Sequence, residues 1–162
     1  MLLYIVRHAW AGQHGDPEYP DDSLRPLTKK GEKRFRRVAK RLAKRGVAPC
    51  RVATSPLVRC RQTADILMDQ LDGQAELTVL NELSPGAQLD ELLPWTRQQA
   101  SGDVAWVGHA PDVNHLLAAL VGSGSGHADM DKGAVAAIEF DGTLAAGAGT
   151  LRWLVTAEVL GV

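Results

Sequence analysis

Cysteine is scarce in this chain, and long apolar runs are missing. Cys50 and Cys60 are the two cysteines among 162 residues, too few for a disulfide framework and without the spacing of metal ligands. No apolar run approaches the roughly 18 residues of a membrane-spanning helix, and no basic leader precedes the first apolar run. These absences predict a soluble, cytoplasmic protein with reduced thiols, no metal site and no membrane association.

The length is that of one domain. A chain of 162 residues falls within the usual domain range and buries roughly 68–70% of its unfolded surface. No internal repeat or linker divides it. Residues 1–162 are therefore predicted to form a single domain.

Short apolar runs alternate with amphipathic stretches, the pattern of a mainly parallel sheet whose strands are joined by helices. The predicted strands are 2–7, 51–54, 77–80, 103–108, 134–140 and 150–157. The predicted helices are 29–45, 56–71 and 111–121, with a weaker one at 88–100 that Pro94 interrupts or offsets. The last two strands are expected to pair antiparallel. The sequence thus predicts an α/β fold, a three-layer sandwich with a mostly parallel central sheet flanked by helices.

Capping residues indicate where these helices begin and end. Thr28 is the predicted N-cap of the first helix, and Gly46 is its predicted terminator. Ser55 followed by Pro56 predicts an N-cap with proline at the first helical position, and Pro111 repeats that arrangement.

Basic and imidazole side chains stand where three predicted strands end. Arg7 and His8 follow the apolar run at residues 2–6. Arg59 lies in the first turn of the helix after the second strand, and His109 follows the fourth strand. Ligands bind at strand ends in open α/β sheets. Two arginines and two histidines there suit a phosphoryl group, because guanidinium forks match phosphate oxygens and stay charged.

Four short motifs carry a family resemblance over nearly the whole chain. They are Arg7-His8-Ala9, Arg25-Pro26-Leu27-Thr28 with Gly31, Ser55-Pro56-Leu57-x-Arg59 followed by Gln62-Thr63-Ala64, and Val107-Gly108-His109-x-Pro111. With these motifs the chain resembles the histidine phosphatase superfamily, with its phosphoglycerate-mutase-like fold, and most closely the SixA-type phosphohistidine phosphatases. The family's commonest form has glycine after the catalytic histidine, whereas the SixA-like branch often has alanine, as Ala9 is here.

The resemblance implies a mechanism without a metal or other cofactor. His8 would be the nucleophile and form a phosphohistidine intermediate that water hydrolyses. Arg7, Arg59 and His109 would bind the phosphoryl group, and the cations around His8 would lower its pKa and keep its ring neutral. About 40 residues separate Arg59 from the strand before His109. That span leaves no room for the large lid insertion of bigger members, so an open site is expected.

Glu82 and Arg25 each leave alternatives open. Glu82 matches the position where mutase-type relatives carry a proton donor, which would make it a general acid. Alternatively, it is a surface carboxylate or the structural partner of an arginine. Arg25 reaches the phosphate or orients substrate, or it forms a structural salt bridge with the acidic loop at residues 16–22. Glu82 bears on the substrate, because an alkoxide leaving group needs protonation whereas imidazole leaving from phosphohistidine needs less help.

Positive charge is concentrated in one segment of a chain whose formal net charge is −1. Residues 25–61 hold 14 of the 18 lysines and arginines, and their one acidic residue is Glu32. The apolar stripe of the helix in this segment is Phe35, Val38, Ala39, Leu42 and Ala43. The opposite face is therefore cationic. It is either a solvated surface or a surface that steers an acidic protein partner, and nucleic-acid binding is a weaker third reading.

Together these features predict a phosphatase that dephosphorylates phosphohistidine on a partner protein and releases inorganic phosphate. A small-molecule phosphomonoesterase is the alternative within the superfamily, favoured if Glu82 is a working acid. A non-catalytic module that binds a phosphorylated ligand is the alternative outside enzymes, and the presence of His8 with its arginines argues against it. Mutase activity is disfavoured, because a short open site does not hold an intermediate away from water.

Overall fold

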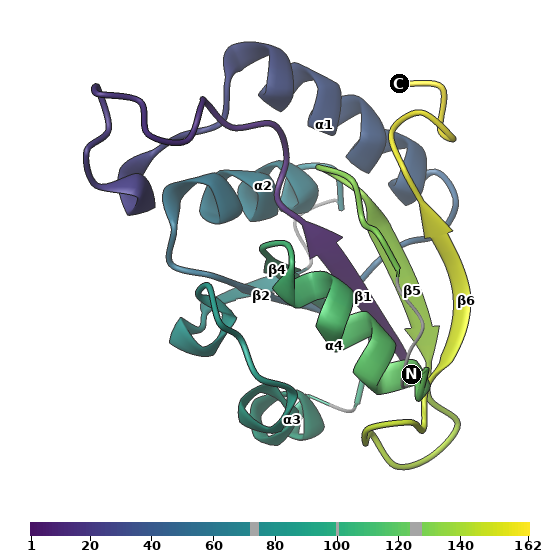
Figure 1. The fold of residues 1–162 in the computed structure, drawn as a ribbon. Helices are drawn as coiled ribbons and strands as arrows, with labels where there is room; N and C mark the ends of the chain where they lie inside the picture. Colours follow the sequence, from purple (N-terminus) through teal and green to yellow (C-terminus); the bar gives the residue numbers. More distant parts are fainter. Residues whose placement is uncertain (72–74, 100, 124–127) are drawn as a thin grey trace.

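A six-stranded sheet covered by helices on both faces makes up the protein (Figure 1). The computed structural model describes residues 1–162 apart from 72–74, 100 and 124–127. The strands are β1 (Leu2–Arg7), β2 (Arg51–Thr54), β3 (Glu76–Val79), β4 (Val104–Gly108), β5 (Val135–Glu139) and β6 (Thr150–Val155). The helices are α1 (Lys29–Ala43), α2 (Val58–Met68), α3 (Leu89–Gln98) and α4 (Asp112–Val121), with short 3-10 turns η1 (Asp22–Leu24) and η2 (Asn81–Leu83).

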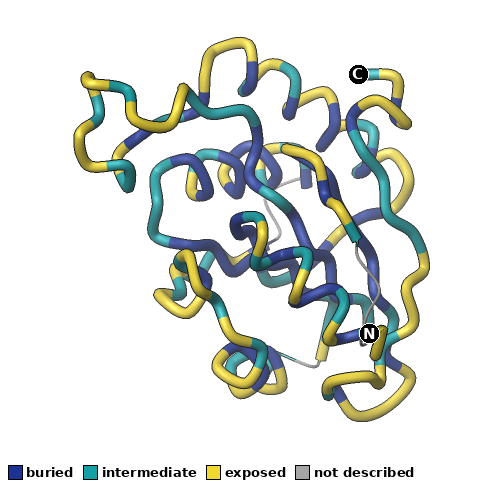
Figure 2. Tube along the Cα trace, viewed as in Figure 1, coloured by how far each residue is buried: buried dark blue, intermediate teal, exposed yellow. Residues whose placement is uncertain are grey.

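Each face of the sheet packs against a different pair of helices. Tyr4 and Val6 of β1 pack in a cluster that includes α1 and α2, whereas Leu3 and Ile5 pack in a second cluster that includes α3 and α4. This alternation follows from the pleat, which sends successive side chains to opposite faces. Figure 2 shows the central strands buried beneath both helical layers. The predicted three-layer α/β fold is confirmed. None of the helices that the structure describes is long and apolar enough to cross a membrane.

Strand direction brings the carboxyl ends of four strands, β1 to β4, to one edge of the sheet. The sheet has the order β3-β2-β4-β1-β5-β6. β4 pairs in parallel with both β1 and β2, whereas β5 pairs antiparallel with β1 and with β6. The chain leaves β1 toward α1 on one face and leaves β4 toward α4 on the other. Adjacent strands whose connections diverge in this way open a crevice at their carboxyl ends.

α1 begins where the sequence predicts and ends two residues before its predicted end at 45. The Thr28 hydroxyl accepts a hydrogen bond from the N–H of Gly31 at 2.9 Å. Gly46, with φ at +84°, follows the last turn and donates its N–H to the carbonyl of Ala43 at 3.0 Å. A Cβ on Gly31 would overlap the carbonyl oxygen of Trp10, so this glycine lets α1 approach the segment that follows His8.

The predicted start of the second helix is wrong. α2 begins at Val58 with Leu57 as its N-cap, so Pro56 precedes the helix and is not its first residue. The Ser55 hydroxyl is instead within hydrogen-bond distance of the His109 ring, 2.8 Å from Nε2. The same hydroxyl accepts the N–H of Leu57 at 3.4 Å, so Ser55 contacts both the turn before α2 and the imidazole.

Two prolines also differ from their predicted positions. Pro111 is the N-cap of α4 and not its first helical residue, so the predicted start is one residue early. Pro94 lies inside α3 without interrupting it, because it stands on the exposed side, where the carbonyl of exposed Asp90 can turn to water. The predicted helix at 88–100 is observed at 89–98, and residue 100 lies outside the described residues.

Candidate active site

The two predicted histidines lie side by side at the ends of β1 and β4. The backbone N–H of His8 donates to the carbonyl of Gly108 at 3.0 Å, which extends the pairing of the two strands by one residue. The rings of His8 and His109 consequently lie with their centroids 5.3 Å apart, edge to face at 61°. Both side chains are buried. The crevice between β1 and β4 therefore holds both imidazoles that the sequence predicted there.

The position of the His8 proton follows from one hydrogen bond. Its Nδ1 lies 2.7 Å from the carbonyl oxygen of Ala9, and because a carbonyl can only accept, Nδ1 carries the proton. Burial is the main cause that lowers the pKa of His8 to about 4; the charges of Arg59, Arg7 and Arg25 contribute to this value, and the hydrogen bond to Ala9 opposes it. At neutral pH the ring is uncharged and its Nε2 keeps a free lone pair. That nitrogen has the electronic state of a nucleophile.

Arg7 and Arg59 each have a buried donor that finds no partner among the described residues. Nη1 of Arg7 donates to the carbonyl of Met130 at 2.6 Å. Nη1 of Arg59 donates to the carbonyl of Asp22 at 2.8 Å, and its Nη2 lies 3.1 Å from the Asp22 carboxylate. The Nε atoms of both arginines are buried and make no hydrogen bond to the residues that the structure describes. Because a buried unpaired donor is costly, these N–H groups mark where an anion would be accepted.

Arg25 forms the salt bridge that the sequence left as one of its alternatives. Its Nε lies 2.7 Å from the Asp22 carboxylate, and its Nη1 donates to the carbonyl of Gly12 at 2.7 Å. Arg25 is buried, and its charge also contributes to the lowered pKa of His8. The two interpretations of Arg25 are therefore compatible: it is fixed by the acidic loop and faces the same site.

Sequence reasoning missed Asp22. Hydrogen bonds from Arg25 and His14 hold the pKa of the Asp22 carboxyl well below its usual range, so it is ionised at neutral pH. The acidic loop was recognised as a partner for Arg25, but the second link, from Asp22 to Arg59, joins residues 37 positions apart. The sequence between them gives no signal for that contact.

His109 rests against a serine and a thiol. Its Nε2 lies 2.8 Å from the Ser55 hydroxyl and 3.4 Å from the Cys60 sulfur. Burial lowers the pKa of His109 to about 3, and the charges of Arg59 and His8 act in the same direction. Burial also raises the pKa of Cys60 to about 12, so its thiol stays protonated and is not a nucleophile. Ser55 is a site residue whose signal was its place at the end of β2, beside the end of β4.

Thr63 links the segment after β1 to α2. Its hydroxyl donates to the carbonyl of Arg59 at 2.7 Å and accepts the N–H of Ala9 at 3.0 Å. One buried hydroxyl thereby fixes the residue after His8 to the turn that carries Arg59. The motif around Thr63 was visible in the sequence, although this structural role was not.

Glu82 forms no hydrogen bond or ion pair with the other predicted site residues in the part of the chain that the structure describes. It is exposed in η2 and lines a shallow hollow with Asn81 and Glu91. A role as proton donor stays a prediction.

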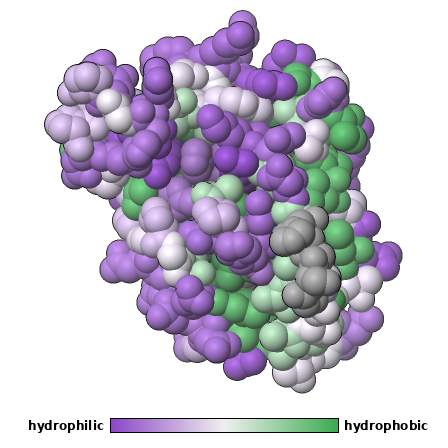
Figure 3. Space-filling model, viewed as in Figure 1, coloured by the Kyte–Doolittle hydropathy of each residue, from purple (hydrophilic) through white to green (hydrophobic). Residues whose placement is uncertain are grey.

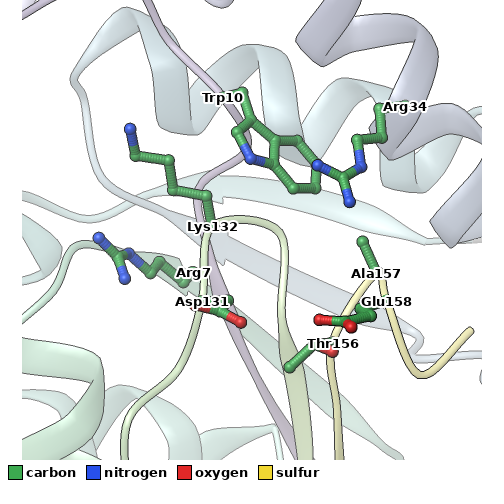
Figure 4. A pocket seen from close by; sticks show the side chains of 8 residues that line it. All are labelled: Arg7, Trp10, Arg34, Asp131, Lys132, Thr156, Ala157 and Glu158. Carbon is green, nitrogen blue, oxygen red and sulfur yellow. The ribbon is translucent and has the colours of Figure 1, made fainter. Parts of the chain in front are cut away.

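The surroundings of the site are open and polar. Figure 3 shows hydrophilic residues gathered over the segment between β1 and α1, on the face where β1 ends. A pocket of about 400 Å³ adjoins Arg7 and is lined by side chains of both charges, among them Arg34, Lys132 and Glu158 (Figure 4). Trp10 forms one wall, with the Arg34 guanidinium 4.2 Å above its ring. Among the residues placed by the structure, no cluster of three histidine, cysteine or acidic side chains could hold a metal ion.

Comparisons with known proteins agree with this geometry. The family model of the histidine phosphatase superfamily (branch 1) matches residues 3–87, and the chain belongs to that superfamily. It is 30% identical over 156 residues to the phosphohistidine phosphatase SixA of Escherichia coli, covering 94% of this chain and 92% of SixA. It is 40% identical over 134 residues to an uncharacterised protein of Picosynechococcus sp., covering 78% and 77% of the two chains. The resemblance inferred from the four motifs is confirmed.

Solved structures give the same result for the fold. The protein histidine phosphatase SixA in complex with tungstate superimposes with a TM-score of 0.86 at 28% identity, covering 99% of each chain. The alpha-ribazole phosphatase of Shigella flexneri superimposes with a TM-score of 0.75 at 18% identity, over 97% of each chain. The second match shows a shared fold alone.

The lowered pKa values predict how stability depends on pH. His8 and His109 have folded pKa values of about 4 and about 3, below their ordinary 6.5. As pH falls below 6.5, these two histidines become protonated in the unfolded chain but stay neutral in the folded chain. The free energy of unfolding should therefore decrease by about 1.4 kcal/mol per pH unit for each histidine. Urea unfolding between pH 7.5 and pH 4.5 measures this slope.

His8→Gln should reduce this slope by about 1.4 kcal/mol per pH unit, the contribution of one histidine. His115→Gln is the matched control, because His115 is exposed on α4 and the substitution also removes one imidazole. Equal slopes for both variants and the wild type would show that His8 is protonated normally in the folded chain.

Proposed function

We propose that residues 1–162 act as one catalytic domain, a phosphatase that removes the phosphoryl group from phosphohistidine on a partner protein through a phospho-His8 intermediate. The observation that carries this proposal is the neutral His8 ring, with its Nε2 lone pair free, beside the unpaired Nε–H groups of Arg7 and Arg59. Similarity to SixA, a phosphohistidine phosphatase whose structure is known with the oxyanion tungstate, supports the same activity.

The first step is attack in line by Nε2 of His8 on phosphorus. The bond between phosphorus and the substrate imidazole breaks, and its electron pair goes to the leaving nitrogen, which takes a proton from water. Arg7 and Arg59 offset the charge on the transferring oxygens, which is the main contribution a protein makes to phosphoryl transfer. A bound dianion also reverses the local charge and favours a proton on His109, which can then donate to a phosphoryl oxygen.

The second step is hydrolysis of phospho-His8. Water attacks phosphorus, the bond from phosphorus to Nε2 breaks, and inorganic phosphate leaves with His8 restored to its neutral form. The hydrogen bond from Nδ1 of His8 to the Ala9 carbonyl persists through both steps and stabilises the positive ring of the intermediate. No step requires a metal or other cofactor.

The surroundings of the site support a substrate carried on a protein. The pocket beside Arg7 opens to solvent and presents charged groups of both signs, with Trp10 as an aromatic wall. Its lining includes neither of the two histidines, so it is a surface next to the site that a protein substrate could contact. The exposed face of α1 carries Arg37, Lys40 and Lys44 in one row. A partner with an acidic surface would complement that row and be steered toward the molecule.

Replacing the nucleophile tests the mechanism. His8→Ala should lower turnover of an aryl phosphate on the order of 10³-fold or more, because no other group described in the crevice is an activated nucleophile. Rapid acid and alkaline quenches should trap acid-labile, base-stable phosphate on the wild type and none on the variant. His115→Ala, on the exposed side of α4, should keep full activity. Full activity in His8→Ala, or label on a hydroxyl side chain, would end this mechanism.

Glu82→Gln should separate the proposed phosphohistidine phosphatase from a small-molecule phosphomonoesterase. An imidazole leaving group needs little protonation, so activity toward a phosphohistidine protein should change less than about threefold. An alkyl phosphate esterase that relied on this acid would lose about 10²–10⁴-fold. Glu91→Gln, in the same hollow, controls for loss of a charge. A large loss on both substrates would favour the esterase.

The dependence of kcat/KM on salt concentration should distinguish electrostatic steering by α1 from the chemical step at the site. Exposed charges are screened within about 10 Å at 0.1 M salt, so kcat/KM for an acidic phosphoprotein should fall as salt is added. Reversal of Arg37, Lys40 and Lys44 to glutamate should slow capture of that substrate severalfold and leave hydrolysis of a small aryl phosphate unchanged. Equal effects on the two substrates would identify this face as an ordinary solvated surface.

A further inference from the structure

One carboxylate, that of Asp22, joins two of the site arginines. Its Oδ1 lies 2.7 Å from Nε of Arg25 and 2.9 Å from Nδ1 of His14, and its Oδ2 lies 3.1 Å from Nη2 of Arg59. Its own backbone carbonyl accepts Nη1 of Arg59 at 2.8 Å. Arg25 and Arg59 are almost fully buried, whereas a third of the Asp22 side chain is exposed. The carboxylate thus holds the arginines from the outer side of the site.

The contacts from Asp22 reach the two terminal nitrogens of the Arg59 guanidinium. The Asp22 backbone carbonyl accepts a hydrogen bond from Nη1, and the Asp22 carboxylate lies 3.1 Å from Nη2. The Nε of Arg59 is buried and has no partner among the described residues. Since Asp22 does not use Nε, this N–H is the donor that remains for an anion.

Arg7 shows the same division of its donors. Its Nη1 donates to the carbonyl of Met130, while its Nε is buried and unpaired among the described residues. The carbonyl of Met130 holds Arg7, and the carbonyl and carboxylate of Asp22 hold Arg59. In each guanidinium these contacts leave the Nε–H unused. The fixing contacts do not use the donors that an anion would need.

We propose that Asp22 is a positioning residue of the phosphoryl site, which fixes the orientation of Arg59 and Arg25 and offsets their mutual repulsion without competing for the anion. This inference rests on the proposed function in naming phosphate as the anion. Three like charges around His8 repel one another, and a carboxylate in contact with two of them lowers that cost. Without the carboxylate, Arg25 would keep only its contact with the carbonyl of Gly12, and Arg59 only its contact with the backbone carbonyl of residue 22.

Asp22→Asn tests the proposal on the whole chain. The amide keeps the shape and the backbone carbonyl but loses the charge and one acceptor. We expect the Kd for inorganic phosphate, and for tungstate as a second probe, to rise between about tenfold and a hundredfold, as a misplaced binding group does. KM for an aryl phosphate should rise in parallel, with a smaller change in kcat. Calorimetry and steady-state kinetics measure these quantities, and a thermal melt verifies folding.

Asp21→Asn is the matched control. Asp21 is the neighbouring residue, is exposed, and uses its carboxylate to accept the N–H of Ser23 at the start of η1. Asparagine can make the same cap. The control therefore removes the same charge from the same loop without touching a site arginine, and it should keep wild-type phosphate affinity. Asp22→Glu, which restores a carboxylate, should recover part of the affinity that Asp22→Asn loses.

Two results would overturn the inference. Tighter phosphate binding in Asp22→Asn would show that the carboxylate competes with the anion, and equal Kd values in Asp22→Asn and Asp21→Asn would show that it does neither. A different result would reject the proposed function: wild-type protein would bind phosphate but would not hydrolyse phosphohistidine. In that case the comparison of Kd values would still decide the role of Asp22.

Discussion

The parallel pairing of β1 with β4 is the constraint on which the site depends. Parallel strands end at the same edge of a sheet, and the hydrogen bond from His8 to Gly108 carries their register one residue past the last strand pair. This register alone places two imidazoles from opposite halves of the chain 5.3 Å apart. The divergence of the following segments, to α1 on one face and α4 on the other, keeps the space beyond the strand ends open. Residues from other elements then complete the crevice.

Concentrated positive charge is the second property of the site, and it adds to burial in keeping both histidines neutral. Burial alone disfavours an imidazolium, and three guanidinium groups in the same crevice make it less favourable still. The arginines in turn are held by protein oxygens, which are the carbonyls of Met130, Gly12 and Asp22 and both oxygens of the Asp22 carboxylate. The result is a preorganised group of donors whose charge a phosphoryl dianion would complement.

Much of the fold could be predicted because it depends on local pattern. The predicted strands agree with the observed ones to within two residues, since each is an apolar run between polar segments, and the buried stripe of α1 follows helical periodicity. His8, Arg7, Arg59 and His109 could be placed because all follow directly from strand ends. Ser55 and Asp22 could not be assigned their observed contacts, because each acts through a side chain that meets a residue far along the chain. From sequence alone, a serine that precedes a proline is most simply interpreted as a helix cap, which is a local role.

The abundance of cations between residues 25 and 61 combines two physically different populations. Arg25 and Arg59 are buried and held by Asp22, so their interactions are short, fixed and little screened by salt. Arg37, Lys40 and Lys44 are exposed and act only as a diffuse field. A count of charges cannot separate them, because both belong to the same basic stretch. Burial separates them: the two buried guanidinium groups can select a phosphoryl group by geometry, whereas the exposed row can only influence how often a charged partner arrives.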